Sequence, residues 1–359
     1  MKNNLKLIVM ENCLEFGKKV DFHLQKTYQE SMIVPISNSR FSNGEGKITI
    51  DGSIRDQDLY ILSDVGNYDI SYSMHGRDHF MSPDEHFQDI KRVISATSGY
   101  ASKITVVMPL LYQSRQHKRK GRESLDCAIA LQELERLGVN HIVTFDCHDP
   151  NVSNAVPLLP FESFYPTNVI LSTLLEKEKE NLENLFVVGP DFGAMERADY
   201  YAKMLGCSVG AFSKKRDLTK VVNGKNPILE HTYLGDSVEG KDVLVVDDMI
   251  ASGSSMIEVG EELKKRGARN VYLVASFALL TEGITPFVEA YQKGVFDKLY
   301  STNLSYVPES IKNEVWYEDV DGSKQLSEII ETLHEKRPMS PLFNGQEEIL
   351  KKTLGGRKE

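Results

Sequence analysis

The sequence has few of the features that mark secreted, zinc-bound or membrane-spanning proteins. Its 359 residues include four cysteines without a Cys-x-x-Cys pair, and its nine histidines show no zinc-type spacing. Buried reduced thiols are therefore expected in place of disulfides or a structural zinc. No apolar run is as long as a membrane span. Met1–Asn4 leads directly to the apolar Leu5–Met10, which we expect to be a strand and not part of a signal peptide. These features predict a cytoplasmic protein with no membrane partner.

Basic residues are also in short supply. Lys and Arg number 42 against 52 Asp and Glu, which gives a formal net charge of −10. This balance argues against nucleic acid as a partner, because binding to a phosphate backbone needs a basic surface. The basic run Arg115–Arg122 stands out against that background. It fits a site for a small anionic ligand at least as well as a solvated loop.

Apolar runs that predict strands alternate with helical patterns along most of the chain. Ser82–Glu85 has the pattern of a capping box with proline at the first helical position. Further helices are predicted over Ser124–Leu137, Ala194–Leu205 and Ser255–Arg266, each followed by a glycine. The alternation predicts an α/β fold with mainly parallel sheets flanked by helices. The expected strands after the first are Asp58–Ser63, Lys103–Pro109, His141–Asp146, Leu185–Pro190, Asp242–Asp248, Asn270–Ser276 and Lys298–Thr302.

A chain of 359 residues suits two domains of ordinary size. The proline-containing stretch Asn151–Pro166 is the expected seam between them. The predicted division is an N-terminal domain over residues 1–160, a C-terminal domain over residues 161–340 and a tail over residues 341–359. Ligands of open α/β sheets bind beyond the carboxyl ends of the strands, so functional side chains are expected there.

The most informative segment is Val243–Met256. Four apolar residues predict a strand buried on both faces, which we expect to end at Asp247 and Asp248. The loop that follows can direct backbone N–H groups and hydroxyls at a phosphate over a helix N-terminus. The two carboxylates suit ribose hydroxyls or a hydrated Mg²⁺. An ordinary acidic joint between strand and helix is the alternative, and the run of small residues favours phosphate binding. That run is Ala251, Ser252, Gly253, Ser254 and Ser255.

Other segments carry polar residues at predicted strand ends or turns: Arg40-Phe41-Ser42-Asn43-Gly44-Glu45, Arg115-Gln116, Thr144–His148, Gly189–Gly193 and Ser213–Arg216. Taken in order with the Asp247–Ser255 loop, they resemble the ribose-phosphate pyrophosphokinase family over most of residues 5–343. The resemblance implies two domains, each similar to the type I phosphoribosyltransferases. It also implies an enzyme that transfers the diphosphoryl group of ATP to the C1 hydroxyl of ribose 5-phosphate with Mg²⁺, for nucleotide biosynthesis.

The resemblance also implies roles for individual residues. ATP would be bound by Phe41, Asn43 and Glu45 in the first segment and by Arg115 and Gln116 in the second. Lys214 and Arg216 would be catalytic, because phosphoryl transfer needs positive charge directed at the transition state. Residues 217–235 would close over bound ATP as a lid. His148 and Asp191 would bind the metal, although a histidine at a strand end is often structural and Asp191 also suits a helix cap. Ribose 5-phosphate would bind to Asp247, Asp248, Ala251, Ser252, Gly253, Ser254 and Ser255.

Several positions depart from the family pattern and indicate a divergent, bacterial-type branch. Asn43, His117 and Ala251 each stand where the family has Asp, and Ala194 stands where it has Gly. Residues 66–81 are longer than the usual link. Two alternatives are therefore kept: a non-catalytic regulatory subunit of the same family, and a phosphoribosyltransferase. The family resemblance also implies a homo-oligomer, a dimer or a hexamer.

Overall fold

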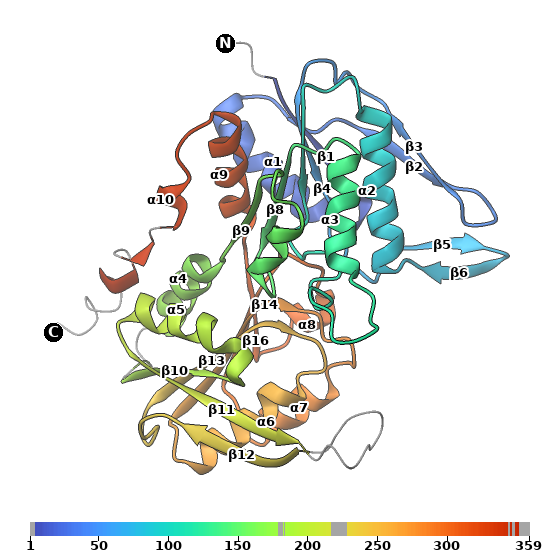
Figure 1. Ribbon diagram of the computed structural model, residues 1–359. Coiled ribbons are helices and arrows are strands. Elements are labelled where there is room, and N and C mark those ends of the chain that lie inside the picture. Colours follow the sequence, from blue (N-terminus) through green and yellow to red (C-terminus); the bar gives the residue numbers. More distant parts are fainter. Residues whose placement is uncertain are drawn as a thin grey trace. The chain divides into compact units, whose positions relative to one another are not determined.

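The computed structural model describes residues 4–178, 182, 184–216, 228–343, 345–346 and 349–351, with the backbone alone for residues 214–216, 228–231 and 343. The chain forms two compact units. Of the described residues, one unit holds those up to Pro166 together with Asn303–Val307 and Asp321–Phe343, and the other holds those in 167–302, 308–320 and after Phe343. Figure 1 shows the elements of each unit.

The first unit is built on a five-stranded sheet with the order β1-β4-β7-β8-β9, in which every neighbouring pair is parallel. Apart from the edge strand β9, the strands are mainly apolar and buried, as expected of a sheet covered on both faces. Helix α9 packs against α1. The strands are β1 (Leu5–Val9), β4 (Asp58–Leu62), β7 (Lys103–Val107), β8 (His141–Phe145) and β9 (Phe161–Phe164), and the helices are α1 (Leu14–Tyr28), α2 (Pro83–Thr97), α3 (Asp126–Arg136), α9 (Ser323–His334) and α10 (Ser340–Phe343).

Two antiparallel hairpins stand outside that sheet and project from the same side of the unit in Figure 1. Strands β2 (Ile36–Arg40) and β3 (Gly46–Ile50) form the first. Strands β5 (Ser71–Met74) and β6 (Arg77–Phe80) form the second, within the long segment of residues 66–81. Its turn residues His75 and Gly76 have φ angles of 51° and 72°, as in a type I′ turn.

The second unit is built on a seven-stranded sheet with the order β12-β11-β10-β13-β14-β15-β16, in which only the β11–β12 pair is antiparallel. Its strands are β10 (Leu185–Gly189), β11 (Ser208–Arg216), β12 (Ile228–Leu234), β13 (Asp242–Ile250), β14 (Asn270–Ala278), β15 (Lys298–Thr302) and β16 (Tyr317–Val320). Its helices are α4 (Thr167–Glu178), α5 (Met195–Leu205), α6 (Ser254–Lys265), α7 (Thr285–Gln292) and α8 (Glu309–Lys312).

The predicted α/β class and the parallel sheets are confirmed. The capping box at Ser82 forms with both of its hydrogen bonds, and Gly206 ends α5 in the left-handed region. Three local expectations differ from the structure. The strand from Asp242 continues to Ile250. In the segment expected to be a lid, Ile228–Leu234 forms β12 against β11, and residues 217–227 lie outside the described residues.

The third difference concerns the expected seam Asn151–Pro166. The first continuous part of the first unit does end there, at Pro166, but the seam also contains a strand. Residues Phe161–Phe164 within it form the edge strand β9 of the first sheet. Residues 303–307 and 321–340, placed in the C-terminal domain by the sequence-based division, and residues 341–343, placed in the tail, pack with the first unit, in which α9 packs against α1. Among the described residues, no helix combines the length and the apolar character needed to cross a membrane.

Candidate functional site

An acidic pair lies near the carboxyl end of β13 in the second unit. Asp248 is buried and Asp247 is partly exposed. The Asp247 carboxylate accepts a hydrogen bond from the Asp248 N–H at 2.9 Å, and the Asp248 carboxylate accepts one from the Met249 N–H at 2.8 Å. Burial raises the pKa of Asp247, the neighbouring Asp248 charge raises it further, and Arg197 opposes both. Two adjacent carboxylates of this kind favour a cation or hydroxyl donors beside them.

The loop after β13 turns at Gly253 into the N-terminus of α6. Gly253 has a φ of 76°, and a Cβ placed there would lie 2.0 Å from Cζ of Phe287, so both the backbone and the packing require glycine. Ser252 Oγ and Ser254 Oγ lie 3.1 Å apart. Within the described part of the chain, no side chain caps α6. The first N–H groups of the helix and these hydroxyls form a cradle suited to a phosphate.

Asp191 and Arg197 extend this edge of the sheet from β10, the neighbour of β13. Asp191 Oδ1 accepts hydrogen bonds from the N–H groups of Gly193 at 2.9 Å and Ala194 at 3.2 Å, so this oxygen acts as a helix cap. Arg197 in α5 places Nη1 3.9 Å from Asp247 Oδ1. Its side chain is 10% exposed, which makes it a buried positive charge next to the acidic pair.

Lys214 and Arg216 lie in β11, which is paired with β12 on one side and β10 on the other. Lys214 pairs with His231 and Arg216 with Ile228, with a register shift between Lys215 and Arg216. Their side chains lie outside the described residues. The strand therefore places both predicted catalytic residues in the sheet that also carries Asp247, at backbone level.

In the first unit, the segment after β7 carries the predicted Arg115 and Gln116. Arg115 is exposed. Gln116 holds this segment in place through two hydrogen bonds. Its side-chain Nε2 donates to the Ser124 carbonyl oxygen at 2.8 Å, and its backbone carbonyl oxygen accepts from the Cys127 N–H at 3.3 Å. The structure thus gives Gln116 a role in shaping the loop and leaves the Arg115 guanidinium at the surface.

His117 joins that segment to the end of the neighbouring strand β8. Its Nδ1 lies 3.1 Å from the Ser114 carbonyl oxygen, and its Nε2 lies 3.1 Å from Asp149 Oδ2. Its ring centroid lies 5.3 Å from that of His148. Burial works to raise the pKa of Asp149, but hydrogen bonds from Asn151 and the charge on His117 outweigh burial and lower it. His117, the departure from the family pattern, therefore has an acidic partner.

The backbone is strained just before His148. Asp146 is buried and has a φ of 38°, an unusual value for a residue other than glycine. Its N–H donates to the Phe164 carbonyl oxygen at 2.8 Å, and the next N–H, of Cys147, donates to Ser163 Oγ at 3.0 Å. Strained backbone of this kind clusters at functional sites. It turns the chain at the end of β8 so that His148 is exposed.

The turn between β2 and β3 holds Phe41, Asn43 and Glu45. The Phe41 N–H donates to the Glu45 carbonyl oxygen at 2.8 Å, and the Gly44 N–H donates to the Phe41 carbonyl oxygen at 2.8 Å. The Asn43 side chain accepts from the Glu45 N–H at 3.2 Å and donates to the Glu45 carboxylate at 3.0 Å. The Phe41 ring is 55% exposed. We call residues 41–45 the β2–β3 loop.

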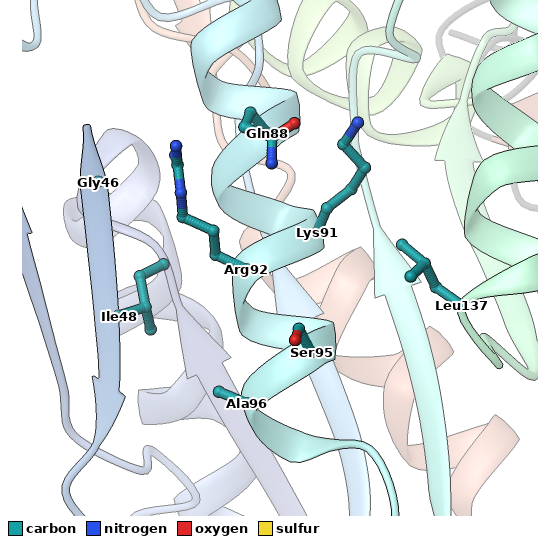
Figure 2. A pocket seen from close by; sticks show the side chains of 8 residues that line it. All are labelled: Gly46, Ile48, Gln88, Lys91, Arg92, Ser95, Ala96 and Leu137. Carbon is teal, nitrogen blue, oxygen red and sulfur yellow. The ribbon is translucent and has the colours of Figure 1, made fainter. Parts of the chain in front are cut away.

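A surface pocket of about 490 Å³ lies between β3 and α2. Figure 2 shows Arg92 and Lys91 at its wall. Both cations already have carboxylate partners, since Arg92 pairs with Asp89 at 2.5 Å and Lys91 with Glu133 at 3.0 Å. None of the predicted site residues lines this pocket, which contains Gly46, Ile48, Gln88, Lys91, Arg92, Ser95, Ala96 and Leu137. It carries no part of the chemistry considered above.

Comparison with known protein families accounts for both units. A family model described as the N-terminal domain of ribose phosphate pyrophosphokinase matches residues 5–138, and a phosphoribosyl transferase domain model matches residues 169–311. The ribose-phosphate pyrophosphokinase of Nostoc sp. is 28% identical over 312 residues, which cover 86% of each chain. Ribose-phosphate pyrophosphokinase 1 of Streptococcus agalactiae is 26% identical over 348 residues, which cover 95% of this chain and 97% of the relative. The chain belongs to the ribose-phosphate pyrophosphokinase family.

The family fold is found in a solved structure as well. The crystal structure of phosphoribosylpyrophosphate synthetase from Mycobacterium smegmatis matches with a TM-score of 0.76 and 21% sequence identity, covering 93% of this chain and 100% of that chain. This likeness shows the shared fold. The expected pair of phosphoribosyltransferase-like domains is thereby confirmed.

The structure groups the residues predicted from the family pattern within each unit. In the second unit, the acidic pair and the 251–255 loop lie together, next to Asp191 and Arg197. In the first, Arg115 and Gln116 lie on the strand-end segment that His117 links to His148. The predicted metal residues His148 and Asp191 belong to different units, and the described residues contain no group of three or more His, Cys, Asp or Glu suited to a metal. Their assignment remains a prediction.

Sequence reasoning missed two residues at these edges. Arg197 lies within a helix, and its neighbours Glu196 and Ala198 carry no recognisable pattern. Asp149 follows His148 directly, and its partner His117 is 32 positions earlier in the chain. The sequence offered one signal: a histidine stands at position 117 where the family pattern has Asp. Such a replacement suggests that a carboxylate from another position lies beside the histidine, as Asp149 does.

Proposed function

We propose that this chain is a ribose-phosphate diphosphokinase, which transfers the diphosphoryl group of ATP to the C1 hydroxyl of ribose 5-phosphate and releases AMP. The observation that carries the proposal is the edge of the second unit where Asp247 and Asp248 precede the Gly253 turn into α6. The small-residue loop supplies donors for the 5-phosphate, and the carboxylates are suited to the ribose hydroxyls. Family membership supports the same activity.

Mg²⁺ is the proposed metal. The donor set fits it, because Mg²⁺ prefers oxygen ligands and needs only one or two carboxylates when substrate phosphates and water complete its shell. Burial, and after it the neighbouring Asp248 charge, raise the pKa of Asp247, and a bound cation would favour the ionised form of this carboxyl. When bound, Mg²⁺ would neutralise charge on the transferring phosphates. His148 and Asp191 are the other proposed ligands, with Asp191 Oδ1 already engaged as a cap.

The remaining assignments belong to the same proposal. Phe41, Asn43, Glu45, Arg115 and Gln116 would bind ATP from the first unit. Lys214 and Arg216 would direct positive charge at the transferring group, where charge develops in the transition state. The homo-oligomer and the cytoplasmic location inferred from the sequence also remain predictions, and light scattering of the purified protein would give the oligomeric state.

A product assay tests the proposal directly. Purified protein is given ATP, ribose 5-phosphate and Mg²⁺, and both AMP and 5-phosphoribosyl 1-diphosphate are measured, alongside an Ala251→Asp variant. We expect the parent to be active, because the 5-phosphate needs hydrogen-bond donors and not a carboxylate at position 251. Each transfer releases one AMP, so the two products should form in equal amounts. Binding of both substrates without product would favour the regulatory subunit. Activity confined to the Asp variant would show that position 251 had switched the enzyme off.

A further inference from the structure

The tip of the β2–β3 loop rests on the hairpin formed by β5 and β6. The N–H of His75, at the hairpin turn, donates to the Ser42 carbonyl oxygen at 3.4 Å. A Cβ placed on Gly44 would lie 2.8 Å from Met74 Sδ and 3.2 Å from Tyr72 Oη. These distances leave no room for another atom, so the loop tip and the hairpin are in direct van der Waals contact.

The hairpin is itself fixed to the first turn of α2 through Glu85. Tyr72 Oη donates to Glu85 Oε1 at 2.7 Å, and His79 Nε2 lies 3.1 Å from Glu85 Oε2. The Ser82 N–H donates to the same Oε2 at 2.9 Å as part of the capping box. The Tyr72 and His79 rings meet edge to face with centroids 5.1 Å apart. One carboxylate therefore joins both strands of the hairpin to the helix.

The base of the β2–β3 loop is held by the same helix. Arg40, the last residue of β2, pairs with Asp89 of α2, and the two side chains are 9% and 2% exposed. Asp89 also binds Arg92 at 2.5 Å. The Arg40 guanidinium lies 5.4 Å from the centre of the Tyr72 ring. The loop is thus held at its base by α2 and at its tip by the β5–β6 hairpin.

We propose that the β5–β6 hairpin is a positioning element that preorganises the β2–β3 loop for ATP. The hairpin lies within residues 66–81, the segment that the sequence predicts to be longer than the family's usual link. The inference rests on the proposed function, which assigns the loop to ATP. Tyr72 and Met74 are positioning residues that act through the loop. A loop already held in its binding conformation does not lose ordering entropy when ATP binds.

The first test needs no ligand. Hydrogen exchange is measured by mass spectrometry on the free full-length protein over the amides of Phe41, Gly44 and Glu45, whose N–H groups are bonded within the loop. The variants are Tyr72→Phe, Met74→Ala and the double variant. The matched control is Asp78→Ala, an exposed position on β6. We expect exchange about 10-fold faster in the double variant, parent rates in the control, and parent rates over β4 and β7 in all of them.

The second test measures kinetic constants for the same proteins. We expect the KM for ATP to rise about 10-fold in the double variant, while the KM for ribose 5-phosphate stays at the parent value. Unchanged exchange of the loop amides would overturn the proposal. Faster exchange with an unchanged KM for ATP would overturn the role in ATP binding. If the parent formed no product, the proposed function would fail, while the exchange data would still decide whether the hairpin holds the loop.

Discussion

Gly253→Ala is the substitution whose effect the structure defines best. The new Cβ would lie 2.0 Å from Cζ and 2.3 Å from Cε2 of Phe287. Phe287 cannot move aside, because it is fully buried and its ring stacks on Trp316 with centroids 5.8 Å apart and an interplanar angle of 14°. The φ of 76° adds a separate cost for any residue with a side chain.

The two costs can be estimated separately. A left-handed backbone conformation costs a non-glycine residue about 1–2 kcal/mol. Forcing a methyl group into a packed aromatic core costs about 1–3 kcal/mol more. Gly253→Ala should therefore destabilise the second unit by about 2–5 kcal/mol. Gly294→Ala is the control, because Gly294 has a similar φ of 67° and a Cβ there would meet no described atom within 4 Å. Its cost should be the backbone part alone.

Urea denaturation followed by tryptophan fluorescence measures both variants. Trp316 is the single tryptophan of the sequence, it is 1% exposed, and it lies against Phe287. Its signal therefore reports on unfolding of the region that the substitution disturbs. The difference between the two variants isolates the packing cost. If Gly253→Ala were no more destabilising than Gly294→Ala, the close approach of the loop to Phe287 would be refuted.

Three further predictions follow from the site and the core. Lys214→Ala should lower kcat about 10²–10³-fold with little change in either KM, and a parent-like kcat would remove Lys214 from catalysis. Calorimetry should show that Asp248→Asn weakens ribose 5-phosphate more than ATP and that Phe41→Ala does the reverse, whereas equal losses in both would indicate misfolding. Burial raises the pKa of Asp64 to about 6, against hydrogen bonds from Tyr306, Ser305 and Gly66 that lower it. Since the folded state then binds more protons than the unfolded state between about pH 4 and pH 6, this group's contribution to stability falls by up to about 3 kcal/mol as pH rises through that window. Denaturation curves at several pH values should show a smaller fall in Asp64→Asn, and equal slopes in variant and parent would contradict the assignment.

The strands predicted correctly are those with continuous apolar runs. Lys298–Thr302 matches β15 residue for residue, and the expected strand from Asp58 matches β4 to within one residue. Strands β2 and β5 escaped detection because Ile36–Arg40 and Ser71–Met74 are mostly polar and half exposed. Their conformation depends on pairing in hairpins and on contacts with α2, which no local pattern records.

The parts of the site that could be predicted are those whose functional residues are consecutive in the sequence. Asp247, Asp248 and the small-residue loop are consecutive, so the carboxylates and the phosphate cradle could be inferred together. The contact between Asp247 and Arg197 joins residues 50 positions apart on neighbouring elements, and only the fold brings them together. Within the segment expected to be a lid, the strand Ile228–Leu234 was not foreseen for the same reason, since it forms through pairing with β11.

The return of the chain to its first unit has a consequence for synthesis on the ribosome. Helix α9 buries Leu326, Ile329 and Ile330 completely, and its His334 binds Asp58 at 2.8 Å. About 160 residues after Pro166 must therefore be synthesised before α9 can cover α1. All strands of the second sheet precede α9 in the chain, so that sheet can form first. A fragment that stopped at Pro166 would keep that apolar face open to other nascent chains and to chaperones.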